Sequence, residues 1–306
     1  MAIFQNYFME NVLTIGIPKG SLQEATLSLF NAAGLSFYGS ERLLWLGSND
    51  VEVKPVLLRP QEIPLYVAKG NLDCGLSGLD WITERGCLES LRLLADLQYS
   101  KQSFRPVRWV LAVPQDSPWE KIEDLQEIQN PPLRVSTELK GITESWFAEH
   151  GIVAEVDFSW GATEAKAPVF ADAIVECTET GSSLRANRLR ILDTVFQSTT
   201  QFFANKEVYH KAGWKRTKLD SIALLLKSCL AADAKVNVRV LAPASEADVI
   251  EALIPSNIGY SIWNGKKNEF LFELIVDKRA ARDLVPVFAR NGAAKITVTG
   301  LDMLCE

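Results

Sequence analysis

Strand-like and helix-like patterns of apolar residues alternate along most of the chain. Residues 12–17 form a continuous apolar run typical of a buried strand, and Pro18-Lys19-Gly20-Ser21 interrupts it. Apolar residues then recur at helical spacing from Leu22 to Ala33, and Gly34 ends this predicted helix. The same reasoning predicts strands at 51–58, 74–78, 110–113, 133–136, 152–158, 173–176 and 193–204, and helices at 63–69, 119–128, 141–150 and 214–232. This alternation favours largely parallel sheets with helices on both faces, arranged as two α/β lobes.

The last seventy residues follow a different order. Apolar residues alternate over 236–240, 258–262 and 270–276, with Asn264-Gly265 giving a strong hairpin signal between the second and third of these strands. Helical spacing appears over 247–254 and 281–288, and a final strand surrounds Ile296 and Val298. The predicted order is therefore βαββαβ, the ferredoxin-like arrangement, and its boundary is expected at 230–235.

Composition and charge narrow the class of protein. The 306 residues are 47% hydrophobic, which suits two or three domains with buried cores. The net charge of −6 disfavours binding to nucleic acid or to an anionic membrane surface. The sequence shows neither a signal peptide at its start nor an apolar run of about 20 residues, the length that spans a bilayer. We therefore expect a soluble, cytoplasmic protein.

Cysteine and histidine are too few for several common kinds of site. The five cysteines are odd in number and include no C-x-x-C pair, so free thiols in a reducing compartment are expected. A zinc site or a catalytic triad would need His150 or His210, the two histidines. His150 ends a predicted helix and His210 lies in a polar stretch, so neither predicts such chemistry. No metal ligand and no acid–base catalyst is predicted.

The most informative stretch runs from Ala173 to Asn187. An apolar strand ends in Glu176, and a turn rich in hydroxyls and containing Gly181 leads into a short helix. Glycine lets the backbone approach a ligand closely, and successive N–H groups at a helix start can surround a phosphate. Glu176 could accept hydrogen bonds from neighbouring ribose hydroxyls. A simple helix-capping turn explains the stretch about equally well on its own.

The stretch resembles the phosphoribosyl pyrophosphate loop of the ATP phosphoribosyltransferase family. The resemblance runs from Gly161-Ala162-Thr163-Glu164 through Asp172-Ala173-Ile174-Val175-Glu176 to Thr180-Gly181-Ser182-Ser183-Leu184. Three residues depart from the family pattern: Glu176 replaces Asp, Cys177 replaces an aliphatic residue and Ser183 replaces Thr. The segment between Glu164 and Asp172 lacks the usual glycine and is one residue short, which leaves the roles of Glu164 and Lys166 open.

Other segments carry the resemblance along nearly the whole chain. They are Ile15–Leu22, Arg42-Leu43, Leu72–Asp80, Arg134–Thr137 and the final seventy residues, which fit the regulatory domain of the long form. The resemblance implies that phosphoribosyl pyrophosphate binds at Glu176, Thr178, Glu179, Thr180, Gly181, Ser182 and Ser183. It implies ATP contacts at Lys19, Gly20, Arg42 and Asp80. From the residues alone, Lys19 would be assigned to a solvated loop, and Arg42 to a surface ion pair.

The resemblance also implies a fold, a reaction and a mode of regulation. Two lobes resembling type II periplasmic binding proteins would comprise 1–104 with 190–230 and 105–189, with hinge crossings near Arg105 and Arg190. An ACT-like ferredoxin domain over 231–306 would bind histidine as feedback inhibitor, in a dimer or hexamer. Adenine N1 of ATP would displace pyrophosphate from phosphoribosyl pyrophosphate, as in the first step of histidine biosynthesis. Mg²⁺ would bind chiefly through pyrophosphate oxygens and water.

Two other functions remain open from the sequence. A non-catalytic two-lobed sensor of a small molecule would have the same fold without the chemistry. A phosphoribosyltransferase acting on another base would keep the loop but change the pocket for the nucleophile. Release of pyrophosphate, and a panel of substrates, would separate the three.

Overall fold

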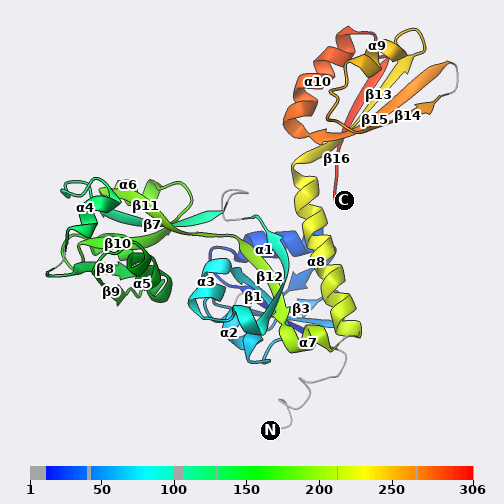
Figure 1. Cartoon of the computed structure of the whole chain (residues 1–306). Coiled ribbons are helices and arrows are strands. Elements are labelled where there is room, and N and C mark those ends of the chain that lie inside the picture. The colour runs from blue at the N-terminus through cyan, green and yellow to red at the C-terminus, as the bar shows by residue number, and fades with distance from the viewer. Residues whose placement is uncertain are drawn as a thin grey trace. The chain divides into compact units, whose positions relative to one another are not determined.

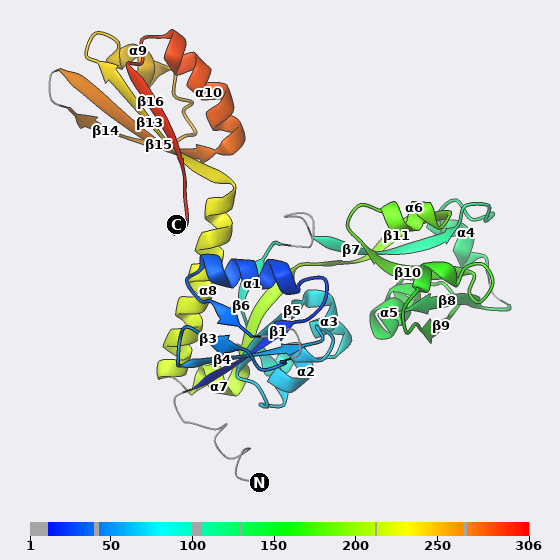
Figure 2. The ribbon, with the colours of Figure 1, turned by 180° about the vertical axis from the view of Figure 1, so that it is seen from behind.

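The computed structural model describes residues 12–39, 43–99, 106–128, 130–211, 213–265 and 268–305 (Figures 1 and 2). The chain forms two compact units, Met1–Ala223 and Leu224–Glu306. The division falls inside the long helix α8 (Trp214–Asp233), a few residues before the boundary predicted at 230–235. The first unit contains two five-stranded sheets, which are called the first and second lobes below.

The first lobe is built on a sheet with one strand inserted against the direction of the others. Its strand order is β4 (Val53–Leu58), β1 (Leu13–Pro18), β5 (Cys74–Gly78), β12 (Thr200–Asn205) and β6 (Leu91–Leu97). β1 pairs in parallel with β4 and β5, whereas β12 is antiparallel to β5 and β6. A small antiparallel pair, β2 (Phe37–Tyr38) and β3 (Gly47–Ser48), accompanies this sheet.

Helices α1 (Gln23–Ala32) and α2 (Ile63–Ala68) lie on opposite faces of the first sheet, and α3 (Leu79–Glu84) follows β5 directly (Figures 1 and 2). α2 approaches the sheet very closely at glycine positions. A Cβ placed on Gly75 would lie 2.4 Å from Ile63 Cγ2, so only glycine permits this packing distance.

The second lobe repeats this design. Its strand order is β11 (Leu189–Ser198), β7 (Val107–Pro114), β10 (Ala173–Thr178), β8 (Leu133–Thr137) and β9 (Ala154–Phe158). β8 is parallel to β9 and β10, and β7 is antiparallel to β10 and β11. Its helices are α4 (Ile122–Gln126), α5 (Lys140–Glu149) and α6 (Ser182–Ala186). The buried apolar residues of β7, β8, β10 and α5 form one core, which Trp81 of α3 also joins.

The inserted strands show where the chain passes between the lobes. β7 enters the second lobe from the first, and β12 enters the first lobe from the second. The prediction of largely parallel sheets therefore holds for the other strands, because the two entering strands alone reverse direction.

The predicted return near Arg190 is wrong. Residues 189–198 pair with β7 in the second lobe, and the chain returns at Thr199, between β11 and β12. A single residue between two apolar strands gives no turn signal, so the sequence pattern merged both strands into one. Arg105, the other predicted crossing, lies outside the described residues.

Asp73, just before β5, joins three elements of the first lobe. Its carboxylate accepts hydrogen bonds from the backbone N–H of Thr14 at 2.8 Å and from the Thr14 hydroxyl at 3.0 Å. It also accepts one from the Lys215 ammonium of α8 at 2.7 Å. Lys218, one helical turn further along α8, bonds to Asp50 at 2.5 Å and to Glu52 at 2.9 Å. These pairs fix the start of α8 on the first lobe. The short helix α7 (Lys206–His210) follows β12 directly.

The second unit confirms the predicted βαββαβ order. Its elements are β13 (Lys235–Pro243), α9 (Ala247–Ala252), β14 (Tyr260–Asn264), β15 (Glu269–Asp277), α10 (Lys278–Arg290) and β16 (Lys295–Gly300). The sheet order is β14-β15-β13-β16, with antiparallel neighbours throughout. Alternate residues of β13 and β15 are buried against Ile250 of α9 and Phe288 of α10. The polar residues that alternate with these buried residues lie on the other face of the sheet.

Two further expectations can be compared with the structure. All five cysteines are free, as their odd number predicted. Among the described residues, no helix has both the length and the apolar character that crossing a bilayer requires.

We predict that Asp73→Ala lowers the free energy of unfolding of the first unit by about 3 kcal/mol. The change removes a nearly buried carboxylate and leaves the Thr14 N–H and the Lys215 ammonium without their acceptor. Urea unfolding followed by tryptophan fluorescence measures it. Asp283→Ala, which breaks only an exposed pair with Arg282, is the control and should change stability by less than about 0.5 kcal/mol. Equal effects of the two substitutions would contradict this role of Asp73.

Candidate functional site

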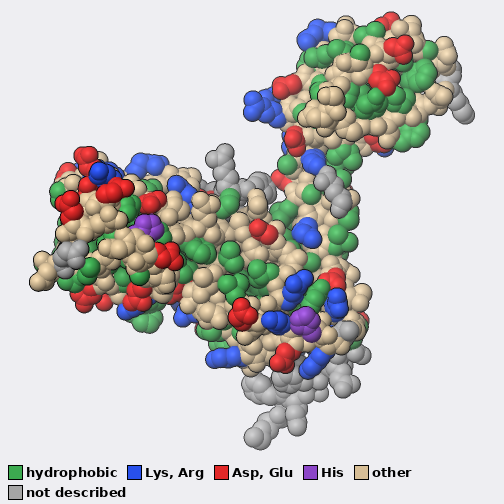
Figure 3. All heavy atoms as spheres, viewed as in Figure 1, with side chains coloured by type: hydrophobic (Ala, Val, Ile, Leu, Met, Phe, Trp, Pro, Cys, Tyr) green, Lys and Arg blue, Asp and Glu red, His purple; other side chains and the backbone are tan. Residues whose placement is uncertain are grey.

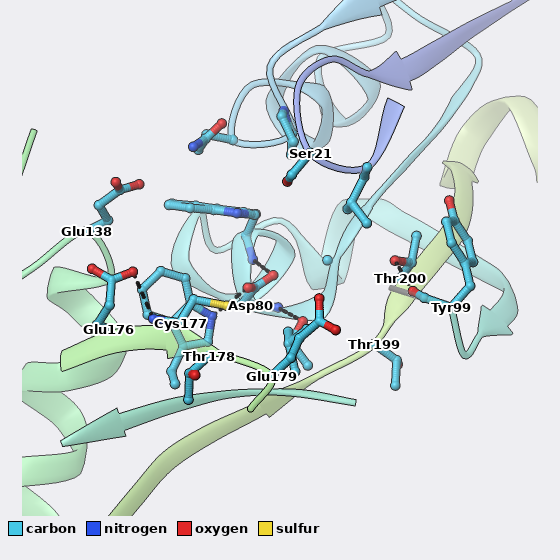
Figure 4. Close-up of a pocket in the computed structure, with 18 of the residues that line it drawn as sticks. Ser21, Asp80, Tyr99, Glu138, Glu176, Cys177, Thr178, Glu179, Thr199 and Thr200 are labelled. Carbon is cyan, nitrogen blue, oxygen red and sulfur yellow. Dashed lines mark hydrogen bonds between the residues drawn. The ribbon is translucent and has the colours of Figure 1, made fainter. Parts of the chain in front are cut away.

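A cavity of about 510 Å³ lies between the two lobes of the first unit (Figure 4). The parallel strands present their carboxyl ends to it, through Ser21 after β1, Gly78 in β5 and Glu138 after β8. β7 and β12 run the other way and present their amino ends, through Val107 and Thr200. Ligands of α/β proteins bind at the carboxyl ends of strands, so this is the expected place for a site.

The turn between β10 and α6 is closed by a short hydrogen bond from a backbone N–H to a side chain. The Gly181 N–H donates to Thr178 Oγ1 at 2.7 Å, and Thr178 is buried. Gly181 has φ +72°, a left-handed conformation that favours glycine. The Arg185 guanidinium donates a hydrogen bond to the Thr180 carbonyl at 3.0 Å and stabilises the turn. A Cβ on Gly181 would lie 3.0 Å from Arg185 Nη1, so a larger residue would meet both strain and contact.

This closed turn presents a row of donors to the cavity. α6 begins at Ser182, and the first N–H groups of a helix have no partner within it. Ser182 and Ser183 both line the cavity. The Thr180 hydroxyl donates to Ser182 Oγ at 3.0 Å, which leaves the Ser182 hydroxyl proton available for a ligand. The turn therefore suits an anion such as a phosphate.

Glu176 lies at the carboxyl end of β10, beside the turn (Figure 4). Its Oε1 accepts the backbone N–H of Cys177 at 3.0 Å. Burial raises the pKa of Glu176 to about 7, and the nearby carboxylates of Glu164 and Glu138 add to the effect. The carboxylate is therefore partly protonated near neutral pH in the absence of a ligand.

Asp80, predicted to contact ATP, lines the cavity but already has partners on both oxygens. Oδ1 accepts the Trp81 backbone N–H at 2.8 Å, and Oδ2 accepts the indole N–H of Trp109 at 2.6 Å. Burial raises its pKa. Because Asp80 belongs to α3 and Trp109 to β7, this carboxylate joins the two lobes. Glu84, at the other end of α3, accepts the N–H groups of Gly141 and Ile142 at 2.9 and 3.0 Å and adds a second link.

Some of the other predicted site residues line the cavity and others do not. Thr178, Glu179, Thr180, Ser182 and Ser183 line it, and Gly181 shapes the turn between them. Lys19 and Gly20 are exposed and fall outside the described lining, although the next two residues belong to it. Arg42 lies outside the described residues.

Glu164 and Lys166, whose roles the sequence left open, lie in different surroundings. Glu164 reaches the turn, where it accepts the Ser183 hydroxyl at 2.5 Å. Lys166 points to Ser159 instead, at 2.7 Å, and lines a separate hollow of the second lobe. The shortened spacing before Asp172 therefore does not separate Glu164 from the turn.

Several lining residues were missed from the sequence. Glu138 directly follows β8, so the rule of strand carboxyl ends could have found it. Trp81 and Trp109 meet edge to face with ring centroids 6.0 Å apart, a contact between distant segments that no local pattern reveals. Tyr99 and Thr200 come from the two crossing segments, which the sequence did not delimit.

The charges of the cavity constrain what it can hold. Four carboxylates line it, those of Asp80, Glu138, Glu176 and Glu179. Among the described residues of the lining, none is Lys or Arg. A polyanionic ligand would therefore need a cation of its own. The described residues include no group of three or more His, Cys, Asp and Glu suited to holding a metal ion.

Comparison with known proteins gives the family. The family model of ATP phosphoribosyltransferases matches residues 59–228. The chain is 44% identical over 286 residues to an ATP phosphoribosyltransferase of Thermodesulfovibrio yellowstonii, covering 93% of this chain and 95% of that protein. The chain belongs to the ATP phosphoribosyltransferase family. A relative in Chlorobium phaeobacteroides with the same name is 43% identical over 299 residues, covering 97% of this chain and 99% of that protein.

A solved structure agrees on the fold. The chain is similar to the ATP phosphoribosyl transferase (HisG:HisZ) complex from Thermotoga maritima, with TM-score 0.60 and 24% identity, over 73% of this chain and all of that one. The resemblance found in the Glu164–Leu184 segment is thus confirmed at the level of the family.

We predict that Glu176→Gln makes the fold more stable at pH 8 relative to the unchanged protein, but not at pH 4. The folded state raises the pKa of Glu176 to about 7, above its usual unfolded value of roughly 4.3. The stability due to the protonated form is complete below pH ~4.3 and is lost as the pH rises through about 7. Glutamine avoids that loss, by up to about 4 kcal/mol.

Thermal unfolding across pH 4 to 9 measures this difference. Glu155→Gln, at an exposed position of β9, is the control and should follow the unchanged protein at every pH. If Glu176→Gln also does so, the Glu176 carboxyl is not titrating in a buried site.

Proposed function

We propose that the chain transfers the phosphoribosyl group of phosphoribosyl pyrophosphate to N1 of the adenine of ATP, releasing pyrophosphate. This is the first step of histidine biosynthesis. The observation that carries the proposal is the pairing, in one cavity, of the Gly181 turn with the Glu176 carboxylate. A phosphate and a ribose on the same ligand need such a pair of groups.

The reaction needs little covalent help from the protein. The lone pair of adenine N1 forms a bond to the anomeric carbon, and the bond from that carbon to the pyrophosphate oxygen breaks. Pyrophosphate leaves with the electron pair, so no protein nucleophile is required. This agrees with a described lining that contains no histidine and no lysine. Catalysis would come from positioning and from electrostatic stabilisation.

The geometry of the turn suggests how the sugar phosphate is held. The 5′-phosphate would accept the N–H groups of Ser182 and Ser183 and the Ser182 hydroxyl. Glu176, near the end of β10 and just before the turn, would accept hydrogen bonds from the ribose hydroxyls in its ionised form. Glu138 lines the same cavity and, with Glu176, would stabilise the positive charge that develops on the ribose ring in the transition state.

ATP would bind against the first lobe. Ser21 and Leu22 follow β1 and line the cavity there, beside the exposed Lys19 and Gly20. The Lys19 ammonium, on its flexible stem, would reach the triphosphate. A contact of Arg42 with the nucleotide stays a prediction. The Asp80 carboxylate would act through Trp109, by keeping the two lobes at the spacing that both substrates need.

Mg²⁺ fits the charge of this cavity. The pyrophosphate of one substrate and the triphosphate of the other would enter a space lined by four carboxylates, a repulsive arrangement without a divalent ion. Such an ion supplies charge neutralisation for the leaving group. Asp80 is engaged by Trp81 and Trp109, and Glu176 is assigned to the ribose, so Glu138 and Glu179 are the remaining lining carboxylates that would contact its water ligands.

The second unit would regulate the enzyme. Its βαββαβ order suits an ACT-like domain, and we propose that it binds histidine as feedback inhibitor in a homo-oligomer, a dimer or hexamer. The two lobes would close on their ligands as type II periplasmic binding proteins do. Cytoplasmic location also stays a prediction. On the face drawn in Figure 3, Lys and Arg side chains are interspersed with Asp and Glu, which does not favour a nucleic-acid partner.

The first test is release of pyrophosphate from ATP and phosphoribosyl pyrophosphate at pH 8. We expect turnover by the unchanged protein, and a loss of about a hundredfold or more in kcat/KM for Glu176→Gln and Thr180→Val. Glu176→Gln removes the proposed ribose contact, and Thr180→Val removes the hydroxyl that orients the Ser182 hydroxyl toward the phosphate, each with little change in side-chain size. Glu155→Gln is the matched control and should keep full activity. Turnover with another purine or pyrimidine base in place of ATP would favour a different phosphoribosyltransferase, and binding without turnover would favour a sensor.

The second test is removal of the divalent ion. Treatment with a chelator should abolish pyrophosphate release, and added Mg²⁺ should restore it, because the described lining offers no cation to replace it. Thermal unfolding without substrates should be unaffected by the chelator, since no described group preforms a metal site. Full activity in the chelator would contradict the charge argument.

A further inference from the structure

Glu164 and Ser183 are joined by a short hydrogen bond that the proposed function does not use. The Ser183 hydroxyl donates to Glu164 Oε1 at 2.5 Å, across a separation of 19 residues. Glu164 lies in the short 3₁₀ helix Thr163–Ala165, between β9 and β10. Ser183 is the second residue of α6, inside the proposed phosphate turn. The inference drawn from this bond rests on the proposed function.

We propose that Glu164 is a positioning residue, which fixes the turn at Ser183 by accepting a hydrogen bond from the Ser183 hydroxyl. Ser183 then gives the 5′-phosphate its backbone N–H and not its hydroxyl. A hydroxyl has one proton to donate, so Ser183 cannot donate to Glu164 and to a phosphate oxygen at once.

The other donors of the turn can be assigned in the same way. The Gly181 N–H donates a hydrogen bond to Thr178 Oγ1, and the Thr180 hydroxyl donates one to Ser182 Oγ. Of the donors of Gly181, Ser182 and Ser183, the N–H groups of Ser182 and Ser183 and the Ser182 hydroxyl then remain for a ligand, and both serines line the cavity. Three donors from two adjacent residues suffice for a phosphate, without the Ser183 hydroxyl.

Glu164 stands on a segment that is itself tightly held. Ser159 and Thr163, both buried, share a hydrogen bond of 2.8 Å between their hydroxyls. Lys166 donates to Ser159 Oγ at 2.7 Å from the far side of the same segment. Because the 3₁₀ helix is fixed at both ends, the bond from Ser183 to Glu164 transfers that rigidity to the turn.

The charge of Glu164 has a second effect, on Glu176. Glu138 and Glu164 face Glu176 from neighbouring segments, and both raise its pKa, after burial, which is the main cause. The Thr163 hydroxyl and the Cys177 N–H act in the opposite direction. Glu179 and Asp80 line the same cavity, and the Arg185 guanidinium donates to the Thr180 carbonyl of the turn. Removing the charge of Glu164 should therefore make Glu176 ionise at lower pH.

Three single variants and one double variant separate these effects: Glu164→Ala, Glu164→Gln, Ser183→Ala and Glu164→Ala with Ser183→Ala. The readout is pyrophosphate release, with kcat/KM for phosphoribosyl pyrophosphate and for ATP determined from pH 5 to 9. Glu164→Ala and Ser183→Ala should each raise the KM for phosphoribosyl pyrophosphate by about ten- to a hundredfold, because each breaks the same charged hydrogen bond. The double variant should lose no more than either single variant. The KM for ATP should stay within about threefold.

Glu164→Gln is the decisive conservative variant. Its amide oxygen can still accept the Ser183 hydroxyl, so at pH 8 the KM should stay within about threefold of the unchanged protein. Its acid limb in kcat/KM should shift to lower pH, because one of the two neighbouring negative charges is gone. A merely structural role of Glu164 would leave that limb in place. Glu144→Gln, on the exposed side of α5, is the control.

Some outcomes would overturn the proposal while leaving the function intact. Additive losses in the double variant would mean that Ser183 donates to the phosphate directly. Unchanged KM values in Glu164→Ala, with turnover in the unchanged protein, would mean that the hydrogen bond positions nothing. No turnover in the unchanged protein would instead contradict the proposed function. Circular dichroism and thermal unfolding identify any variant that fails to fold, and Glu164→Gln then still tests the electrostatic part.

Discussion

The hydrogen bond from the Gly181 N–H to the Thr178 hydroxyl is the interaction on which the site depends. At 2.7 Å it closes the chain back on the last residue of β10, and only the left-handed conformation of Gly181 allows this path. The closure sets the start of α6, where Ser182 and Ser183 line the same cavity as Glu176. Without it, the hydroxyl-rich segment would be an ordinary loop beside a buried carboxylate.

The architecture of the lobes gives this turn a partner surface. Because β7 and β12 are inserted against the direction of their sheets, the chain passes twice between the lobes at the edge where the parallel strands end. Strands β5, β7, β10, β11 and β12 line the cavity, and β1, β4, β6 and β8 lead into residues that line it. The contact of Asp80 with Trp109, and that of Glu84 with the start of α5, hold the lobes through α3. In the proposed reaction, this arrangement would place the two substrates on facing surfaces.

Local signals in the sequence were sufficient for much of this. The strand that carries Glu176, the Gly181 turn and the βαββαβ order all follow from side-chain periodicity and turn residues, and the structure has each of them, with the strand extended to Thr178. The return of the chain at Thr199 could not be predicted, because one residue between two apolar strands leaves no polar interruption. The buried pair of Asp80 with Trp109 joins residues 29 positions apart, and the approach of Glu164 to Ser183 depends on tertiary packing. Long-range contacts of this kind decide which polar groups remain available to a ligand, and a single sequence does not contain them.

The most direct measurement of the central claim is a crystal structure of the protein with phosphoribosyl pyrophosphate and Mg²⁺. The account predicts the 5′-phosphate oxygens within about 3 Å of the Ser182 and Ser183 nitrogens, the ribose hydroxyls on Glu176, and the Ser183 hydroxyl still on Glu164. A 5′-phosphate bound elsewhere in the cavity, with the turn in contact with water alone, would contradict it.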